Sequence, residues 1–250
     1  MEAPWHKAQC HNAALMCGRF ALFTPPVRLA RYFQATLGDD VDPEQPPSWN
    51  VAPTTPVLAV RAHRPAAGRP LERTLTLLRW GLIPSWAKDP STGSRLFNAR
   101  AESVTNRPSF SSAFASRRVI IPADGFYEWH KLNSGAKQPH FFTRADGEPL
   151  AMAGVAESWW DKQAPDDVPP IRSCTIITTS AGPDMDGIHD RMPVILSPDA
   201  FDRWLDPESE DVSELTTLLR PTPSGTIAHH PVGPRIGSFR NDDPQLIEPI

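Results

Sequence analysis

Proline is the residue type that most restricts how this chain can fold. The 250 residues include 29 prolines. Proline ends or kinks a helix from within, and inside a sheet it is tolerated mainly at edges and bulges. We therefore expect no long helices, but many short strands joined by turns and irregular connections. A chain of this length can bury about 70% of its unfolded surface, so it needs no disulfide or metal to fold.

Alternating and buried apolar runs predict where the regular elements lie. Helix starts are recognised by a cap residue, an early proline and an acid, as in Ser197-Pro198-Asp199. No internal repeat divides the chain, and strands with a few short helices predict a single α+β domain. Strands are expected at 74–82, 119–122, 141–144, 150–158 and 171–179, and helices at 109–115, from Ser197 onward and over 209–219.

The three cysteines, Cys10, Cys17 and Cys174, form no Cys-x-x-Cys pair, and one is left over in any pairing. This argues against a disulfide framework and a zinc site, and it suits a reducing, cytoplasmic compartment. We expect no cofactor and no metal. Cys174 lies in an apolar run, so we expect it to be buried in a strand. Residues 1–15 do not form a signal peptide, and no run approaches the ~20 apolar residues of a membrane span.

The net charge of −4 conceals an uneven distribution along the chain. Residues 61–118 hold 11 Lys and Arg against 3 Asp and Glu, whereas residues 141–250 hold 8 against 19. A basic segment beside an acidic remainder predicts a localised surface for an anion such as nucleic acid. A solvated face with scattered arginines is the alternative explanation.

Cys17 directly follows an internal methionine, Met16. If the working polypeptide begins at Cys17, this residue carries both a thiol and a free α-amine. That pair can condense with an aldehyde to close a five-membered thiazolidine ring, which an internal cysteine cannot do. The alternative is a cysteine that simply packs at the start of a strand beside Gly18.

Two further segments have residues suited to nucleic acid. Trp80 and Trp86 flank a loop with Gly and Pro, where tryptophan can stack on unpaired bases or wedge into a duplex. A place in the aromatic core is the alternative. Asn98 and Arg100 share a face if their segment is extended, and together they suit a phosphate or sugar oxygen. An ion pair of the arginine with Glu102 is the competing explanation.

Glu128 and His189 are candidates for proton transfer. Glu128 lies between Tyr127 and Trp129, just after an apolar run, and apolar surroundings favour the neutral form of a carboxylic acid. His189 precedes an apolar run, and histidine can exchange a proton near neutral pH. An exposed turn glutamate and a structural histidine are the alternatives.

Seven blocks of sequence occur in one order: CGRF, WNVAPT, WGLIPSW, NARAES, PADGFYEW, TTSA and IHDRMPVIL. In these blocks the chain resembles the SRAP family, the SOS response-associated peptidase proteins that process abasic sites in DNA. The resemblance runs from about Cys17 to Pro249. It implies one α+β domain, residues 17–250, around a bent, barrel-like, mostly antiparallel sheet with short peripheral helices and a DNA groove. Residues 1–16 would be a leader or a mis-assigned start.

The resemblance also implies roles for single residues. Those implied to be catalytic are Cys17 as the nucleophile, Asn98, Glu128 and His189. Those implied to contact DNA are Arg19, Trp80, Trp86, Arg100 and Trp129.

The implied function is the capture of an abasic site as a covalent thiazolidine crosslink in the DNA-damage response. The α-amine of an N-terminal residue has an ordinary pKa of about 7.7–8.0, so it is partly neutral at pH 7 and can attack an aldehyde. The DNA would be single-stranded or a junction, because the aldehyde must be reachable. The resemblance also implies a monomer that is cytoplasmic and associated with the nucleoid. The basic segment 61–118 would follow the phosphate backbone of the DNA.

Two other functions stay open. One is a cysteine-type peptidase, a hydrolase, that removes residues 1–16 with Glu128 and His189 as acid and base; a lyase activity is a separate possibility for the same enzyme. The other is a non-enzymatic module that binds single-stranded DNA through Trp80, Trp86 and Trp129.

Overall fold

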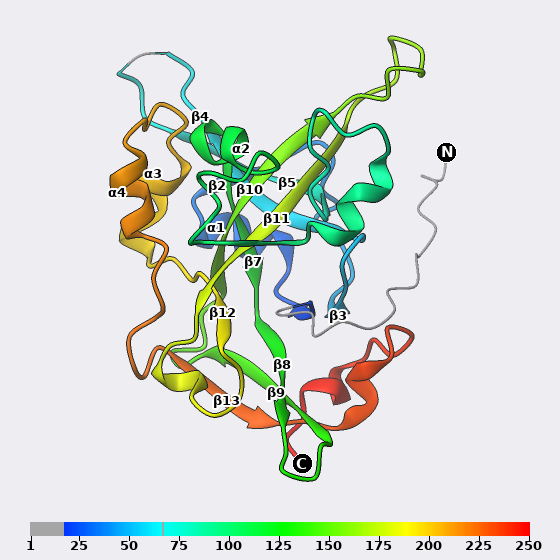
Figure 1. Cartoon of the computed structure of the whole chain (residues 1–250). Helices are drawn as coiled ribbons and strands as arrows, with labels where there is room; N and C mark the ends of the chain where they lie inside the picture. The colour runs from blue at the N-terminus through cyan, green and yellow to red at the C-terminus, as the bar shows by residue number, and fades with distance from the viewer. Residues whose placement is uncertain (1–17, 67) are drawn as a thin grey trace.

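The structure is a computed structural model that describes residues 18–66 and 68–250, and Cys17 lies outside them. The described residues form two sheets with a few short helices at their periphery (Figure 1). The strands are β1 (Phe20–Leu22), β2 (Ala35–Leu37), β3 (Ser48–Val51), β4 (Pro56–His63), β5 (Glu72–Trp80), β6 (Asn98–Arg100), β7 (Arg118–Ala123), β8 (Gly125–Lys131), β9 (Lys137–Arg144), β10 (Leu150–Trp159), β11 (Ile171–Ser180), β12 (Arg191–Pro193) and β13 (Ile227–Pro231).

The helices are short, as the prolines predict. The longest α-helix among the described residues has 7 residues. Proline is the first residue of α1 and of each of the five 3-10 helices. No helix in this part of the chain is long and apolar enough to cross a membrane. The α-helices are α1 (Pro26–Tyr32), α2 (Ser111–Ser116), α3 (Phe201–Leu205) and α4 (Val212–Thr217), and the 3-10 helices are η1 (Pro90–Arg95), η2 (Pro183–Met185), η3 (Pro198–Ala200), η4 (Pro234–Gly237) and η5 (Pro244–Ile247).

The larger sheet closes into a barrel. Its strand order is β12-β11-β10-β7-β4-β5-β2, and β11 also pairs in parallel with β5, where Cys174 lies opposite Trp80. This pairing joins β11, β10, β7, β4 and β5 into a ring. Fully buried apolar side chains, among them Leu58, Ile120 and Ile176, form the core. The predicted barrel-like α+β domain is therefore confirmed.

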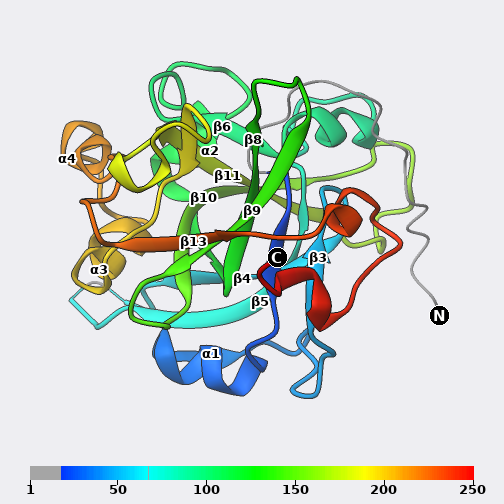
Figure 2. The ribbon, with the colours of Figure 1, turned by 90° about the horizontal axis from the view of Figure 1, so that it is seen from below.

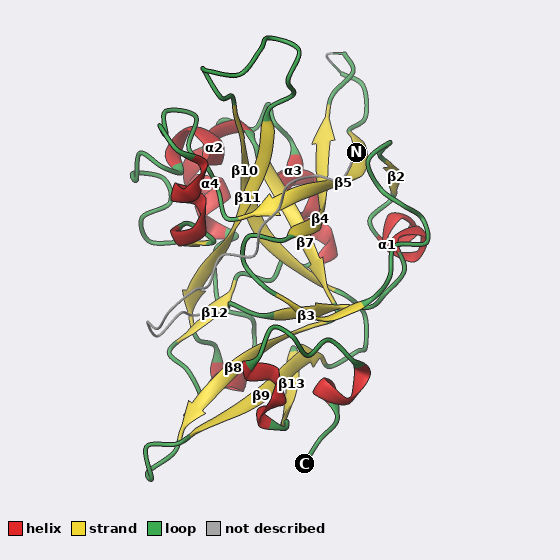
Figure 3. Ribbon diagram, turned by 90° about the vertical axis from the view of Figure 1, so that its right-hand side faces the viewer, coloured by secondary structure: helices red, strands yellow, loops and turns green. Residues whose placement is uncertain are grey.

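The smaller sheet is open and antiparallel, with the order β13-β9-β8-β1-β3. In Figures 1 and 3 the strands β8, β9 and β13 lie at one end of the molecule and the barrel strands β4, β5, β10 and β11 at the other. Seen from below, β8, β9 and β13 cross in front of the barrel (Figure 2). The strand β1 joins the two regions, because Phe20 packs in the main core while Ala21 packs in a second cluster under β8 and β9.

The predicted strands are present with small shifts of their ends, but two helix predictions need correction. The helix expected over 209–219 is limited to Val212–Thr217, with the Asp211 carboxylate accepting a hydrogen bond from the Glu214 N–H. Ser197 stands at the predicted helix start, yet its side chain makes no capping hydrogen bond there. A single 3-10 turn, η3, comes before α3.

Candidate functional site

The described chain begins beside Glu128. The strands β1 and β8 pair with Phe20 opposite Phe126, and the Tyr127 N–H donates to the Arg19 C=O at 3.0 Å. Continuing this antiparallel register sets Gly18 opposite Glu128. The residue that follows Cys17 in the sequence therefore lies next to the predicted acid.

Glu128 and His189 lie close together although they come from segments 61 residues apart. The Glu128 side chain is only 2% exposed, and its Oε2 lies 3.8 Å from His189 Nε2. The Arg191 N–H lies 3.1 Å from His189 Nδ1 and the Arg191 C=O lies 3.3 Å from the same nitrogen, so the Arg191 backbone orients the ring with Nε2 toward Glu128. The exposed Asp190 carboxylate lies 3.3 Å from Nδ1. At 3.8 Å the carboxylate and the imidazole are within ion-pair distance but beyond an ordinary hydrogen bond.

Arg191 fixes the loop that carries His189. Its Nη2 donates to the Thr178 C=O at 2.7 Å and to Glu102 Oε2 at 3.0 Å. The hydrogen bond from Arg191 holds the pKa of the Glu102 carboxyl below its ordinary value. The close ion pair of Glu102 is with Arg191, whereas Arg100, the partner that the competing explanation gave it, contributes a smaller charge effect on Glu102. Sequence reasoning did not single out Arg191, and no local pattern links residues 102 and 191.

Asn98 and Arg100 lie on β6, which pairs in parallel with β11. The Ala99 between them is buried, whereas Asn98 is half-buried and Arg100 is exposed. Alternate residues of a strand share a face, so the predicted common face of an amide and a guanidinium is confirmed. The Glu102–Arg191 ion pair follows directly on this strand and connects it to the His189 loop.

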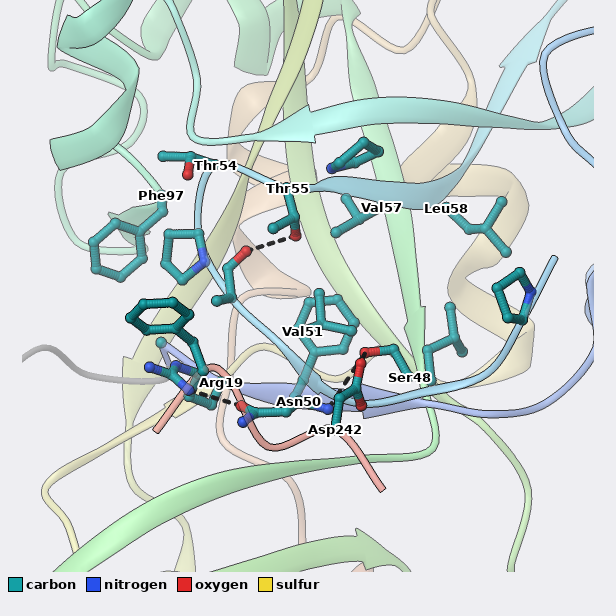
Figure 4. A pocket seen from close by; sticks show the side chains of 18 of the residues that line it. Arg19, Ser48, Asn50, Val51, Thr54, Thr55, Val57, Leu58, Phe97 and Asp242 are labelled. Atoms are coloured by element: carbon teal, nitrogen blue, oxygen red, sulfur yellow. Dashed lines mark hydrogen bonds between the residues drawn. The ribbon is translucent and has the colours of Figure 1, made fainter. Parts of the chain in front are cut away.

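A pocket of about 600 Å³ opens between β3, β4 and the C-terminal segment (Figure 4). Arg19 points toward Asn50, and its Nη1 donates to Asn50 Oδ1 at 2.7 Å. Asn50 Nδ2 donates to the Asn241 C=O at 2.7 Å, and Asp242 accepts from Ser48 Oγ at 2.9 Å, so the C-terminal segment is fastened across the pocket. Sequence reasoning missed Asn50 and Asp242.

The pocket is lined by residues that are next in sequence to three of the candidate catalytic residues. Its lining includes Gly18, Phe97 and Trp129, which are the sequence neighbours of Cys17, Asn98 and Glu128. Arg19 and the 40% exposed Phe239 also line it.

The two tryptophans of the WGLIPSW block have opposite surroundings. Trp80 has no exposed surface, and its indole N–H donates to the Phe97 C=O at 2.8 Å, so it belongs to the core and its assignment as a DNA contact is corrected. Trp86 is 60% exposed. Gly81 directly follows Trp80 and has a φ of +120°, a conformation that favours glycine. A Cβ at this position would lie 2.5 Å from the Gly93 carbonyl oxygen.

Cys174 is buried in β11, as predicted. Burial raises the pKa of its thiol far above the ordinary value, so it stays protonated and unreactive. Among the described residues it is the free cysteine, and it is no competitor for the role of nucleophile.

The structure is thus a barrel-based α+β domain in which a buried carboxylate and an imidazole lie together, and in which Arg100 and Trp86 are exposed. The chain belongs to the SRAP family: the family model for SOS response associated peptidase (SRAP) matches residues 16–239.

The chain is similar over nearly its whole length to curated proteins of this family. It is 39% identical over 235 residues to abasic site processing protein YoqW of Bacillus subtilis (strain 168), covering 93% of this chain and 99% of the relative. It is 34% identical over 268 residues to abasic site processing protein HMCES of Gallus gallus, covering 94% and 78%. An X-ray structure of a protein from Bacteroides thetaiotaomicron has the same fold, with a TM-score of 0.80, 22% identity, and coverage of 94% and 100%.

Proposed function

We propose that this protein processes abasic sites in DNA and captures them as a thiazolidine through Cys17. The observation that carries the proposal is the buried Glu128 with His189 beside it. Glu128 lies on the strand β8, which pairs with β1 and donates a backbone hydrogen bond to the C=O of Arg19, two residues after Cys17. The names of the curated relatives support the substrate class.

The reaction balances without a redox step. The abasic sugar opens to an aldehyde at C1, and the α-amine of Cys17 adds to that carbon. Water leaves, a Schiff base forms, and the thiol sulfur adds to the same carbon while its proton passes to nitrogen. The five-membered ring then holds the DNA covalently, with one water released.

Glu128 and His189 supply the proton transfers of this sequence. One group gives a proton to the sugar ring oxygen as the ring opens, and the other takes a proton from the attacking amine. Their separation of 3.8 Å lets a proton return between them after small movements. Because Glu128 is only 2% exposed, the reacting sugar has to leave any base stack to reach it, which favours single-stranded or junction DNA.

Arg100 and Trp86 give the DNA contacts that the proposal needs. Both are exposed, and Arg100 follows Asn98 on the same strand face. The guanidinium suits a phosphate next to the lesion, and the indole suits an unpaired base. Trp129, which lines the pocket, and Arg19 complete the proposed contact surface.

A denaturing gel with labelled single-stranded DNA that contains one abasic site tests the proposal. The chain that starts at Cys17 and its Cys174→Ala variant give a band that survives denaturation, and the Cys17→Ala variant of that chain gives none. DNA without the lesion gives no band. If Cys17→Ala still crosslinks, the proposed chemistry is wrong, and binding that ignores both the lesion and Cys17 would support a simple DNA-binding module.

The peptidase in the family description has a specific place in this proposal. Removal of residues 1–16 would free the α-amine of Cys17, and the same Glu128–His189 pair would serve as acid and base. The intact mass of purified protein, followed over time without DNA, then falls to that of a chain starting at Cys17. If the protein itself removes residues 1–16, the Glu128→Gln variant keeps the mass of the full 250-residue chain.

A further inference from the structure

Three histidines form a row on one face of the open sheet, next to the site but outside all seven sequence blocks. Glu128 lies opposite His140 on β9, and His130 lies two residues further along β8. Phe142 lies opposite His229 on β13, so His229 points to the same face. The ring centroids of His130 and His140 are 6.1 Å apart, and those of His140 and His229 are 5.1 Å apart.

The central feature of this row is a pair of nitrogens that face each other. His140 Nδ1 and His229 Nδ1 are 3.1 Å apart. Two imidazole lone pairs at this distance repel, so either one ring carries a proton on Nδ1 and donates it to the other as an N–H···N hydrogen bond, or a metal ion lies between the two nitrogens.

The separation suits a metal ion. Imidazole nitrogens bind Zn²⁺ at about 2.0–2.1 Å, which places two such ligands about 2.9 Å apart at a right angle and about 3.3 Å apart at a tetrahedral angle. The observed 3.1 Å lies between these limits.

The surroundings keep the pair available as ligands. Burial lowers the pKa of His140, and the neighbouring His229, His130 and His230 lower it further, which favours the neutral ring that can bind a metal ion. His230 lies on the opposite face of β13, where its Nε2 is 2.7 Å from the Ile247 carbonyl oxygen. Glu128 faces the row from β8 and brings negative charge to it when ionised.

We propose that His140 and His229 bind a divalent transition-metal ion, with Zn²⁺ and Cu²⁺ as the ions that imidazole suits. Within residues 18–66 and 68–250 no group of three or more His, Cys, Asp or Glu side chains is arranged for a metal. Two imidazoles and water therefore form the coordination shell, and His130 is the nearest further imidazole. This proposal is independent of the proposed function.

Titration calorimetry with Zn²⁺ tests the site on the full chain. Wild type and His63→Ala, which removes a single exposed imidazole elsewhere, bind with equal affinity and stoichiometry. His140→Phe and His229→Ala weaken one site by about tenfold or more. The thiol of Cys17 can take up the same ion, but it is present in all four proteins and cancels in the comparison.

Pulsed electron paramagnetic resonance with Cu²⁺ provides a second readout. Two coupled imidazoles are expected in wild type and one in His229→Ala. Because His229 is exposed, its replacement does not endanger folding. Unchanged Zn²⁺ affinity and stoichiometry in His229→Ala, or a Cu²⁺ signal that this variant leaves unchanged, would overturn the proposal and leave a shared proton between the two rings.

Discussion

The barrel and the open sheet differ in what their strands bury. In the barrel, the strand β7 is buried along its whole length, and after the buried Arg118 at its start it consists of apolar residues that join the main core. In the open sheet, β8 passes from the buried Phe126 to the exposed Lys131, and one of its faces carries Glu128 and His130. A closed barrel has no free edges and supplies stability. An open sheet lets ionisable side chains reach both the core and the solvent, and here it carries the proposed chemistry.

Replacement of Glu128 by Gln should have the largest effect, because it should slow the chemistry of the open sheet and leave the stability of the barrel nearly unchanged. The amide keeps the shape of the side chain but cannot give or take the proton, so crosslinking should slow by about 10²–10⁴-fold. The free energy of unfolding should change by no more than about 1 kcal/mol, because the barrel is untouched. Single-turnover crosslinking kinetics and urea unfolding measure the two effects. A wild-type rate would remove Glu128 from the mechanism.

Trp80 and Trp86 allow the same test with one residue type, because Trp80 lies in the barrel core and Trp86 is exposed. Trp80→Ala empties part of the barrel core and should cost about 3–5 kcal/mol of stability. Trp86→Ala should leave stability within about 0.5 kcal/mol but weaken binding of single-stranded DNA by about 1–3 kcal/mol. Thermal unfolding and fluorescence anisotropy test the pair. Equal effects of both variants on stability would contradict the division between core and surface.

The smallest expected effect is a pH dependence that belongs to the open sheet. Burial and the neighbouring histidines lower the pKa of folded His140 below its unfolded value, so the unfolded chain binds more protons. Stability should therefore fall as the pH drops below about 6.5, and His140→Phe should flatten the decline. Asp40, which packs on the barrel, behaves in the opposite way. Burial alone would raise the pKa of its carboxyl, but hydrogen bonds from Thr76 and Leu77 and the charge of Arg172 have the larger effect and lower that pKa. Its contribution is lost only at more acid pH. Urea unfolding between pH 8 and pH 5 gives the slope, and an equal slope in His140→Phe would contradict the assignment.

Local sequence patterns predicted the strands better than their arrangement. The alternation in 74–82 and the apolar run in 171–179 predicted β5 and β11, but nothing local predicts that Cys174 lies opposite Trp80 and closes the barrel. The strand β4 was missed because it begins with proline and is buried on both faces over Val57–Val60, so it shows no alternation.

The site was predictable only where residues lie in recognisable blocks. Glu128 and His189 were identified by their blocks, and the structure brings them together. The ion pair between Arg191 and Glu102 and the facing rings of His140 and His229 depend on strand register, which the sequence does not show. Trp80 and Trp86 share one block, yet only packing against Phe97 and its neighbours determines which of them is buried.

The mass of the crosslinked protein tests the central claim most directly. A chain that starts at Cys17 should form an adduct with abasic single-stranded DNA that survives denaturation, with the DNA joined to both the α-amine and the thiol of that residue. The chain that retains residues 1–16 should form none until those residues are lost, because its Cys17 has no free amine. An adduct on the intact 250-residue chain would contradict the account.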